Sequence, residues 1–132
     1  MKENILVIDD EESIRFSFHR FLAVEGYNVI TAETYKEALA RMDETIFDLI
    51  LADIVLEDGC GIDILQEVIQ RTLKTHVIIM TAYPTAQTYD ESFRMNASDY
   101  LFKPLRQKKL LHSVNTLFQN TGRKRADVEI KL

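Results

Sequence analysis

The chain has 132 residues, with 46% hydrophobic and 28% charged side chains, a formal net charge of −5 at pH 7 and one cysteine, Cys60. A chain of this length and composition is typical of one globular domain whose core is large enough to fold unaided. The single cysteine excludes an internal disulfide framework, and the acidic balance argues against sequence-independent binding of nucleic acid, which requires Lys and Arg to neutralise phosphates.

Residues 1–4 lead directly into an apolar run, so we expect no signal peptide. No apolar run approaches the roughly 20 residues that a membrane-spanning helix needs. A lone cysteine also fits a reducing compartment. We therefore expect a cytoplasmic location and no membrane partner.

Short apolar runs alternate with stretches of helical period along the chain. Buried strands are predicted for the runs at residues 5–8, 49–52, 77–80 and 100–102. Five strand–helix pairs can be counted, and this alternation is typical of βαβ units around a parallel sheet. The pattern therefore predicts an α/β fold.

Two helices are predicted in the first third of the chain. The apolar stripe of the first is formed by Ile14, Phe18, Phe21 and Leu22. Gly26 should end this helix, because glycine readily adopts the left-handed conformation found there. The apolar stripe of the second is formed by Tyr35, Ala38, Leu39 and Met42. Thr34 is its predicted N-cap.

A third helix is predicted after the apolar run at 49–52. It is expected to bury Ile62, Leu65 and Ile69, which recur at helical spacing. Gly59 and Gly61 are expected to give the preceding loop its backbone freedom.

The fourth predicted helix has a sparse apolar face, formed only by Ala86, Tyr89 and Phe93. It should end near Asn96, a residue that tolerates the left-handed conformation. Because so few apolar residues share one face, we expect this helix to be held loosely.

A fifth helix is predicted from a strong apolar stripe. The stripe consists of Leu110, Leu111, Val114, Leu117 and Phe118. Helical periodicity is lost from Asn120 onward. The basic residues 123–125 are fewer than the five to eight of a nucleic-acid-binding patch. We therefore interpret residues 1–120 as the domain and 121–132 as a C-terminal tail or linker.

Polar side chains stand at the ends of the predicted strands. Asp9 and Asp10 follow the first run, Asp53 follows the run at 49–52, and Thr81 and Lys103 close the last two runs. In open α/β sheets ligands bind at the carboxyl ends of the strands, so these five side chains are expected to converge. The set predicts a phosphate and metal site.

Three carboxylates placed together should recruit a cation, because two unit charges 4 Å apart repel by about 4 kcal/mol at an effective dielectric near 20. Mg²⁺ fits best, since it takes carboxylate oxygens and keeps several waters. Asp10 and Asp53 are the predicted direct ligands, with Asp9 acting through water and the main-chain carbonyl of Val55 completing the set. The alternative is that Asp9 or Asp10 caps the first helix.

Asp53 is the candidate nucleophile, because a carboxylate can attack phosphorus to form an aspartyl phosphate. Thr81 offers a hydroxyl donor and Lys103 a positive charge to the phosphate oxygens. Taken singly, Thr81 is equally an ordinary strand residue and Lys103 a surface side chain with a buried stem.

Four motifs resemble the receiver domain of bacterial two-component response regulators. They are residues 8–11 (IDDE), residues 51–54 (LADI) with Gly61 beyond them, residues 80–82 (MTA) and residues 99–104 (DYLFKP). The resemblance covers about residues 3–120. It implies a flavodoxin-like (βα)5 fold, a doubly wound five-stranded parallel sheet of order 2-1-3-4-5.

The resemblance also implies a role for each matching residue. Asp53 would accept a phosphoryl group from a sensor histidine kinase or phosphotransfer protein, Asp9 and Asp10 would hold Mg²⁺, and Lys103 would bind the phosphate. Thr81 and Tyr100 would be the switch residues, and the Lys103–Pro104 peptide would be cis. Such a domain assists only its own phosphorylation and dephosphorylation, and is not otherwise an enzyme.

Several positions depart from the family's pattern. Glu57 stands where the family often has proline, and Val55 is apolar where other members carry polar groups that position water. Proline is also missing before the fourth strand, at residues 73–76. These departures leave open the shape of the loop over the site and the rate of dephosphorylation.

The alternative function is that of a haloacid-dehalogenase-like, Mg²⁺-dependent phosphohydrolase. That chemistry needs a second aspartate two residues after the nucleophile, where this chain has Val55. A flavin-binding module is disfavoured because Asp9, Asp10 and Glu11 would repel the flavin phosphate.

The output is expected at the fourth helix, fifth strand and fifth helix. The candidate interface for a partner or a homodimer contains Tyr89, Phe93, Tyr100, Lys108 and Lys109. A covalently linked effector domain is the other expected partner. The stripe of the fifth helix followed by basic residues resembles receivers of sigma-54-dependent transcription activators.

Overall fold

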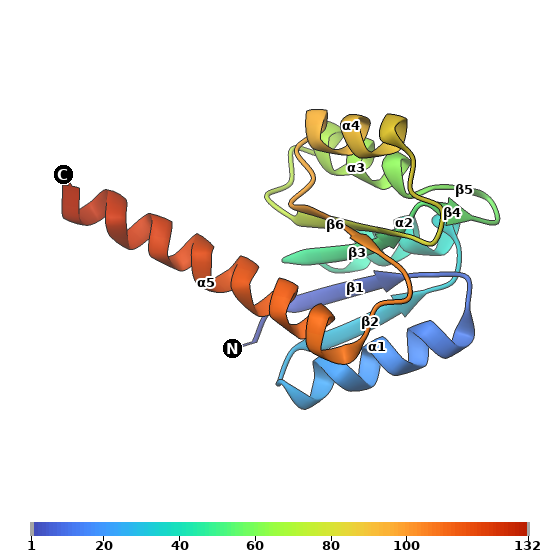
Figure 1. The fold of residues 1–132 in the computed structure, drawn as a ribbon, viewed down its shortest axis with the longest axis horizontal. Coiled ribbons are helices and arrows are strands. Elements are labelled where there is room, and N and C mark those ends of the chain that lie inside the picture. The colour runs from blue at the N-terminus through green and yellow to red at the C-terminus, as the bar shows by residue number, and fades with distance from the viewer. Residues whose placement is uncertain (1, 132) are drawn as a thin grey trace.

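The structure, a computed structural model, describes the backbone of residues 2–131 and the side chains of residues 2–119. In this part of the chain, five parallel strands form one sheet (Figure 1). The strands are β1 Asn4–Ile8, β2 Asn28–Ala32, β3 Leu49–Asp53, β6 His76–Thr81 and β7 Asp99–Phe102. Their order is β2-β1-β3-β6-β7, with parallel pairing throughout. The flavodoxin-like topology is therefore confirmed.

Helices cover both faces of this sheet (Figure 1). One face carries α1 Glu12–Val24 and α5 Gln107–Lys131. The other carries α2 Tyr35–Glu44, α3 Gly61–Gln70 and α4 Ala86–Arg94. Each strand thus leads into a helix, as the alternation of apolar runs and helical periods predicts.

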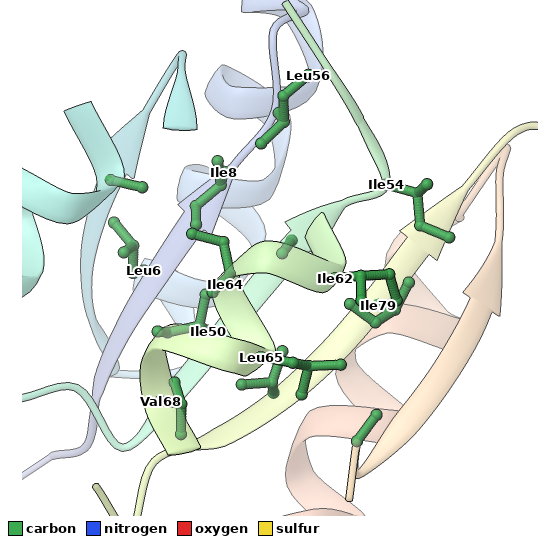
Figure 2. Packing of buried hydrophobic residues seen from close by; sticks show 14 of the residues in the cluster. Leu6, Ile8, Ile50, Ile54, Leu56, Ile62, Ile64, Leu65, Val68 and Ile79 are labelled. Carbon is green, nitrogen blue, oxygen red and sulfur yellow. The ribbon is translucent and has the colours of Figure 1, made fainter. Parts of the chain in front are cut away.

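The core has two parts, one on each face of the sheet. Alternate residues of β1 supply them, with Leu6 and Ile8 facing α2 and α3, and Ile5 and Val7 facing α1 and α5. Figure 2 shows the first part, in which side chains of α3 lie over those of the central strands. Strands buried on both faces read as continuous apolar runs, which is why the sequence revealed them.

The helix ends follow the predicted local rules. Gly26 has a φ of 95° and its N–H donates to the carbonyl of Ala23. The hydroxyl of Thr34 accepts from the N–H of Glu37 at 3.0 Å, which makes Thr34 the N-cap of α2. Asn96 follows α4 with a φ of 70°. All three predictions are confirmed.

The burial of Ile69 was predicted wrongly. Ile62 and Leu65 are buried as expected, but Ile69 is 51% exposed. The buried stripe of α3 is completed by Ile64 and Val68 instead. Successive helical residues are rotated by about 100°, so Ile69 turns away from the sheet once Val68 faces it.

A short antiparallel hairpin stands where the sequence indicated only a loop. It consists of β4 Val55–Leu56 and β5 Gly59–Cys60, and it follows Asp53 directly. Gly59 in this hairpin and Gly61 directly after it are needed for space, and not for conformational freedom, because Gly26 is the glycine with positive φ among the described residues. A Cβ on Gly61 would lie 2.5 Å from the main-chain oxygen of Asp53.

The last helix continues beyond its apolar stripe. Leu110 and Val114 are fully buried against α1 and the sheet, while the helical backbone runs on to Lys131. Figure 1 shows that this last part of α5 extends away from the sheet. The side chains of the basic residues 123–125 lie outside the described ones. In the described part of the chain, no helix has the length and hydropathy needed to cross a membrane.

Candidate functional site

Four strands deliver polar side chains to the same edge of the sheet. Asp9 directly follows β1, Asp53 ends β3, Thr81 ends β6 and Lys103 directly follows β7. The register pairs Ile8 with Ala52, so Asp9 lies beside Asp53 across the two central strands. These strands are neighbours in the sheet, and therefore their carboxyl ends form one site.

The three carboxylates come together at this edge. One oxygen from each of Asp9, Asp10 and Asp53 lies within 4.8 Å of the others. Asp9 is fully buried and Asp53 is 5% exposed, whereas Asp10 is exposed. Glu11 occupies the N-cap position of α1 and makes no side-chain capping bond. The side chain of Asp9 accepts a hydrogen bond from the N–H of Glu11 at 2.9 Å, and Glu11 is the residue directly before the helix.

Lys103 reaches into the same cluster from the far side. Its Nζ lies 2.6 Å from Oδ2 of Asp9 and 2.9 Å from Oδ2 of Asp53. Only 8% of the Lys103 side chain is exposed, so the alternative of a surface lysine is wrong. The Lys103–Pro104 peptide bond is cis, as the resemblance implies. The ammonium therefore bridges two of the three carboxylates.

Burial and pairing act in opposite directions on these charges. Burial raises the pKa of Asp9 above its usual value, and the nearby Lys103 ammonium opposes that rise without cancelling it. Burial alone would lower the pKa of Lys103, but hydrogen bonds and charge attraction from Asp53 and Asp9 outweigh it and raise that pKa. Lys103 is therefore protonated at neutral pH, where it compensates the buried negative charge.

Thr81 lies at the end of β6, and its hydrogen bonds are to main-chain groups. Its side chain is fully buried, and its Oγ1 accepts from the N–H of Tyr83 at 2.9 Å. The main-chain carbonyl of Thr81 accepts from the N–H of Lys103 at 2.8 Å. The hydroxyl of Thr81 is thereby fixed beside the start of the loop that follows β6.

The donor set fits a hard divalent cation. All three side chains offer carboxylate oxygens, the ligands that Mg²⁺ prefers. Oδ2 of Asp9 is buried and faces the Lys103 ammonium at 2.6 Å, so this carboxylate is held beside Asp53 by a positive charge.

Tyr100 lies inward, beneath α4. Its ring is 6% exposed, and its hydroxyl is 2.8 Å from Oγ1 of Thr88 on α4. The rings of Tyr89 and Phe102 pack against it with centroids 5.2 and 5.8 Å away. Tyr89, Phe93 and Phe102 remain 47%, 40% and 58% exposed. An exposed aromatic surface thus lies over α4 and β7.

Two residues at the site were not recognised from the sequence. Asp58, in the turn of the hairpin, accepts two main-chain hydrogen bonds from the start of α2. The turn consists of Glu57 and Asp58, and no sequence signal marked the Asp58 side chain, because its partners lie on another element. Thr88 contacts Tyr100, which is 12 residues away in the chain, and no sequence pattern pairs a helix threonine with a strand tyrosine.

Known proteins are similar to this chain in sequence and in fold. The profile of the family described as "Response regulator receiver domain" matches residues 5–115. The chain is 38% identical over 102 residues to the transcriptional regulatory protein ZraR of Escherichia coli (strain K12), a match that covers 77% of this chain and 23% of that protein. The chain thus spans about a quarter of the length of the first curated relatives that it matches.

Two solved structures extend the comparison. A CheY-like response regulator receiver domain protein from Methanospirillum hungatei JF-1 superposes with a TM-score of 0.88 at 28% identity, covering 94% of this chain and 99% of that one. The beryllofluoride-activated NtrC4 receiver domain dimer gives a TM-score of 0.82 at 30% identity, covering 89% and 97%. Neither these structures nor the relatives support the phosphohydrolase alternative.

Proposed function

The chain belongs to the response regulator receiver domain family of phosphorylation-activated signalling switches, and we propose that Asp53 is its phosphoacceptor. The proposal rests on the environment of the Asp53 carboxylate. Its Oδ2 lies 2.9 Å from the Lys103 ammonium, and its Oδ1 accepts from the N–H of Val55 at 3.2 Å. The carboxylate is therefore oriented at the end of the central strand.

The reaction is a displacement at phosphorus. An oxygen of Asp53 attacks the phosphorus of the donor and forms a new O–P bond, while the bond between phosphorus and the donor's nitrogen or oxygen breaks. The electron pair of that bond leaves with the donor, and the product is an aspartyl phosphate. Lys103 binds the phosphoryl oxygens as a positive charge, and Thr81 donates its hydroxyl proton to them. No separate substrate is turned over, so the domain is not an enzyme in the usual sense.

Asp10 and Asp53 are the proposed direct ligands of Mg²⁺, with Asp9 acting through a water and the main-chain carbonyl of Val55 as a further ligand. When bound, the cation offsets the negative charge of the carboxylates and of the incoming phosphoryl group. The support for this assignment is the cluster of three carboxylates within 4.8 Å.

The switch consists of Thr81 and Tyr100. A phosphoryl group adds about −1.5 to −2 charges, and hydrogen bonds to charged groups contribute roughly 1.5–3 kcal/mol each. Moving a population from 1:99 to 99:1 takes about 5.5 kcal/mol, which bonds from Thr81 and Lys103 together with the cation can supply. A shift of Thr81 toward the phosphate changes the space available to Tyr100 beneath α4.

The output surface is formed by α4, β7 and α5. The proposed interface contains Tyr89, Phe93, Tyr100, Lys108 and Lys109, with Tyr89 and Phe93 exposed on α4. The occupant is a partner or a second copy of this chain. The NtrC4 receiver domain, which has the same fold, is described as a dimer in its beryllofluoride-activated form.

The phosphoryl donor is a sensor histidine kinase or a phosphotransfer protein. A groove of about 410 Å³ lies between α1 and the segment that joins β7 to α5. Lys103 lines this groove and also contacts Asp53. A donor seated on the apolar side chains of Phe18, Phe21 and Leu105 would therefore lie beside the acceptor.

The wider role is regulation of transcription from a cytoplasmic location. ZraR is a transcriptional regulatory protein about four times as long as its matched part, so an effector domain linked to this receiver is the proposed output. An effector of the sigma-54-dependent class is the specific form of this proposal. Residues 1–120 form the receiver and 121–132 the linker.

Intact-mass measurement after incubation with acetyl phosphate and Mg²⁺ tests the acceptor. The parent protein should gain one phosphoryl mass, and Asp53→Asn should gain none because a neutral amide is not a nucleophile toward phosphorus. Asp43→Asn is a matched control, since Asp43 lies on α2 in an ion pair with Arg71. Labelling that persists in Asp53→Asn would assign the acceptor elsewhere.

A further inference from the structure

The hairpin β4–β5 follows Asp53 almost directly along the chain, and the carboxylate of Asp58 in its turn accepts hydrogen bonds from the start of α2. We propose that Asp58 is a positioning residue for phosphorylation, which holds this hairpin, and through it Val55, against Asp53. The proposal rests on the proposed role of Asp53 as phosphoacceptor. Asp58 itself does not touch the reacting atoms.

Both oxygens of Asp58 are used in this contact. Oδ1 accepts from the main-chain N–H of Tyr35 at 2.7 Å, and Oδ2 accepts from that of Lys36 at 3.0 Å. These are the first two residues of α2, where N–H groups lack partners within the helix and a negative charge is favoured. Asp58 thus joins the turn of the hairpin to the start of α2.

The protonation state of Asp58 favours this contact. The hydrogen bonds from Lys36 and Tyr35 lower the pKa of Asp58 below its usual value. The side chain is therefore a carboxylate at neutral pH, and its two bonds are charge-assisted. An amide in its place keeps one acceptor oxygen and loses the charge.

Two glycines, Gly59 in the hairpin and Gly61 directly after it, fix the distance of the hairpin from both neighbours. A Cβ on Gly59 would lie 3.0 Å from Cβ of Tyr35, so the hairpin packs closely on α2. Gly61, which starts α3, packs on the main chain of Asp53 and donates its N–H to the carbonyl of Ile54 at 3.0 Å. The hairpin is therefore held between α2 and the end of β3.

Val55 transmits this position to the acceptor. It is the first residue of the hairpin, and its N–H donates to Oδ1 of Asp53 at 3.2 Å. Its carbonyl is also the proposed main-chain ligand of Mg²⁺. If the contact of Asp58 with α2 is lost, both groups of Val55 lose their fixed position, and the acceptor carboxylate loses its orientation.

Comparison of Asp58→Ala with Thr34→Ala tests the proposal. Thr34 is a matched control, because it also accepts a main-chain hydrogen bond from the first turn of α2 but makes that bond without the hairpin. Both variants should lower the melting temperature. Only Asp58→Ala should weaken Mg²⁺ binding, measured by titration calorimetry, and slow phosphorylation by acetyl phosphate, each by about tenfold, the effect typical of outer groups that orient a site.

A second substitution separates positioning from folding. Asp58→Asn keeps one acceptor for the N–H groups of Tyr35 and Lys36, so its phosphorylation rate should lie between those of the parent and Asp58→Ala. Equal rates and equal Mg²⁺ affinity in Asp58→Ala and Thr34→Ala would overturn the proposal and leave Asp58 as a helix cap. Failure of the parent to take up phosphate would instead contradict the assignment of Asp53.

Discussion

Helices α3 and α4 lie on the same face of the sheet and differ sharply in what they bury. α3 buries Ile62, Ile64, Leu65 and Val68 over the central strands (Figure 2). In α4 the one buried residue is Ser92, a polar side chain. Two helices of similar length can therefore be packed on one sheet with very different strength.

The contacts that hold α4 are mostly between polar and aromatic side chains. Thr88 contacts the hydroxyls of Thr85 and Tyr100, and the ring of Tyr89 packs on that of Tyr100. Such a hydrogen bond contributes about 0.5–1.5 kcal/mol, whereas burial of one large apolar side chain contributes about 1.5–3 kcal/mol. α4 is therefore the helix that can move at small cost, and it contacts Tyr100, the proposed switch residue, directly.

The largest expected difference between the two helices is in their contribution to stability. Ile64→Ala should lower the free energy of unfolding by about 2–5 kcal/mol, because Ile64 is fully buried and its truncation leaves a cavity. Phe93→Ala on α4 should lower it by less, since Phe93 is 40% exposed. Urea denaturation of both variants gives the comparison. Equal losses would contradict the difference in packing.

Mg²⁺ should act on the two helices unequally. A cation bound only by the folded protein stabilises it by roughly 2.7 kcal/mol at 100 times its Kd. Amides of α3, which open with the whole fold, should become more protected from hydrogen exchange by this amount, while amides of α4 that open locally should not change.

Asp10→Asn should remove this gain in stability from Mg²⁺ and raise the stability of the metal-free protein, because it removes repulsion between carboxylates. If Asp10→Asn retains the full gain, Asp10 is not a ligand.

A smaller effect is expected at the contact between α4 and Tyr100. Thr88→Val keeps the shape of the side chain and removes its hydroxyl, so it should cost about 1 kcal/mol. Hydrogen exchange should quicken in α4 and remain unchanged in α3. Thr72→Val is the control. Thr72 lies in the loop after α3, and its hydroxyl donates to the main-chain carbonyl of Arg71, the preceding residue. Faster exchange in α3 would mean that the two helices are not independent.

The contrast between the helices was largely predictable from the sequence. The sparse face of Ala86, Tyr89 and Phe93 indicated a weakly packed helix, and the strands were evident because buried strands are continuous apolar runs. The site could be located because the carboxyl ends of parallel strands meet at one edge. These features depend on local pattern and on a general rule of topology.

The features that were missed depend on contacts between distant segments. The space needed by Gly61 is set by the main chain of Asp53, and the roles of Asp58 and Thr88 are set by partners on other elements. The exposure of Ile69 depends on how α3 is rotated over the sheet. No periodicity within one segment contains this information.

We propose that phosphorylation at Asp53 moves α4 through Thr81 and leaves α3 in place. Beryllofluoride, a mimic of the phosphoryl group, allows a direct test by amide chemical shifts in the presence of Mg²⁺. In the parent protein, large changes should reach α4 and β7 but be small in the body of α3, and in Thr81→Ala the changes should stay near Asp53. Changes that reach α4 equally in both proteins, or that are as large in α3 as in α4, would contradict the claim.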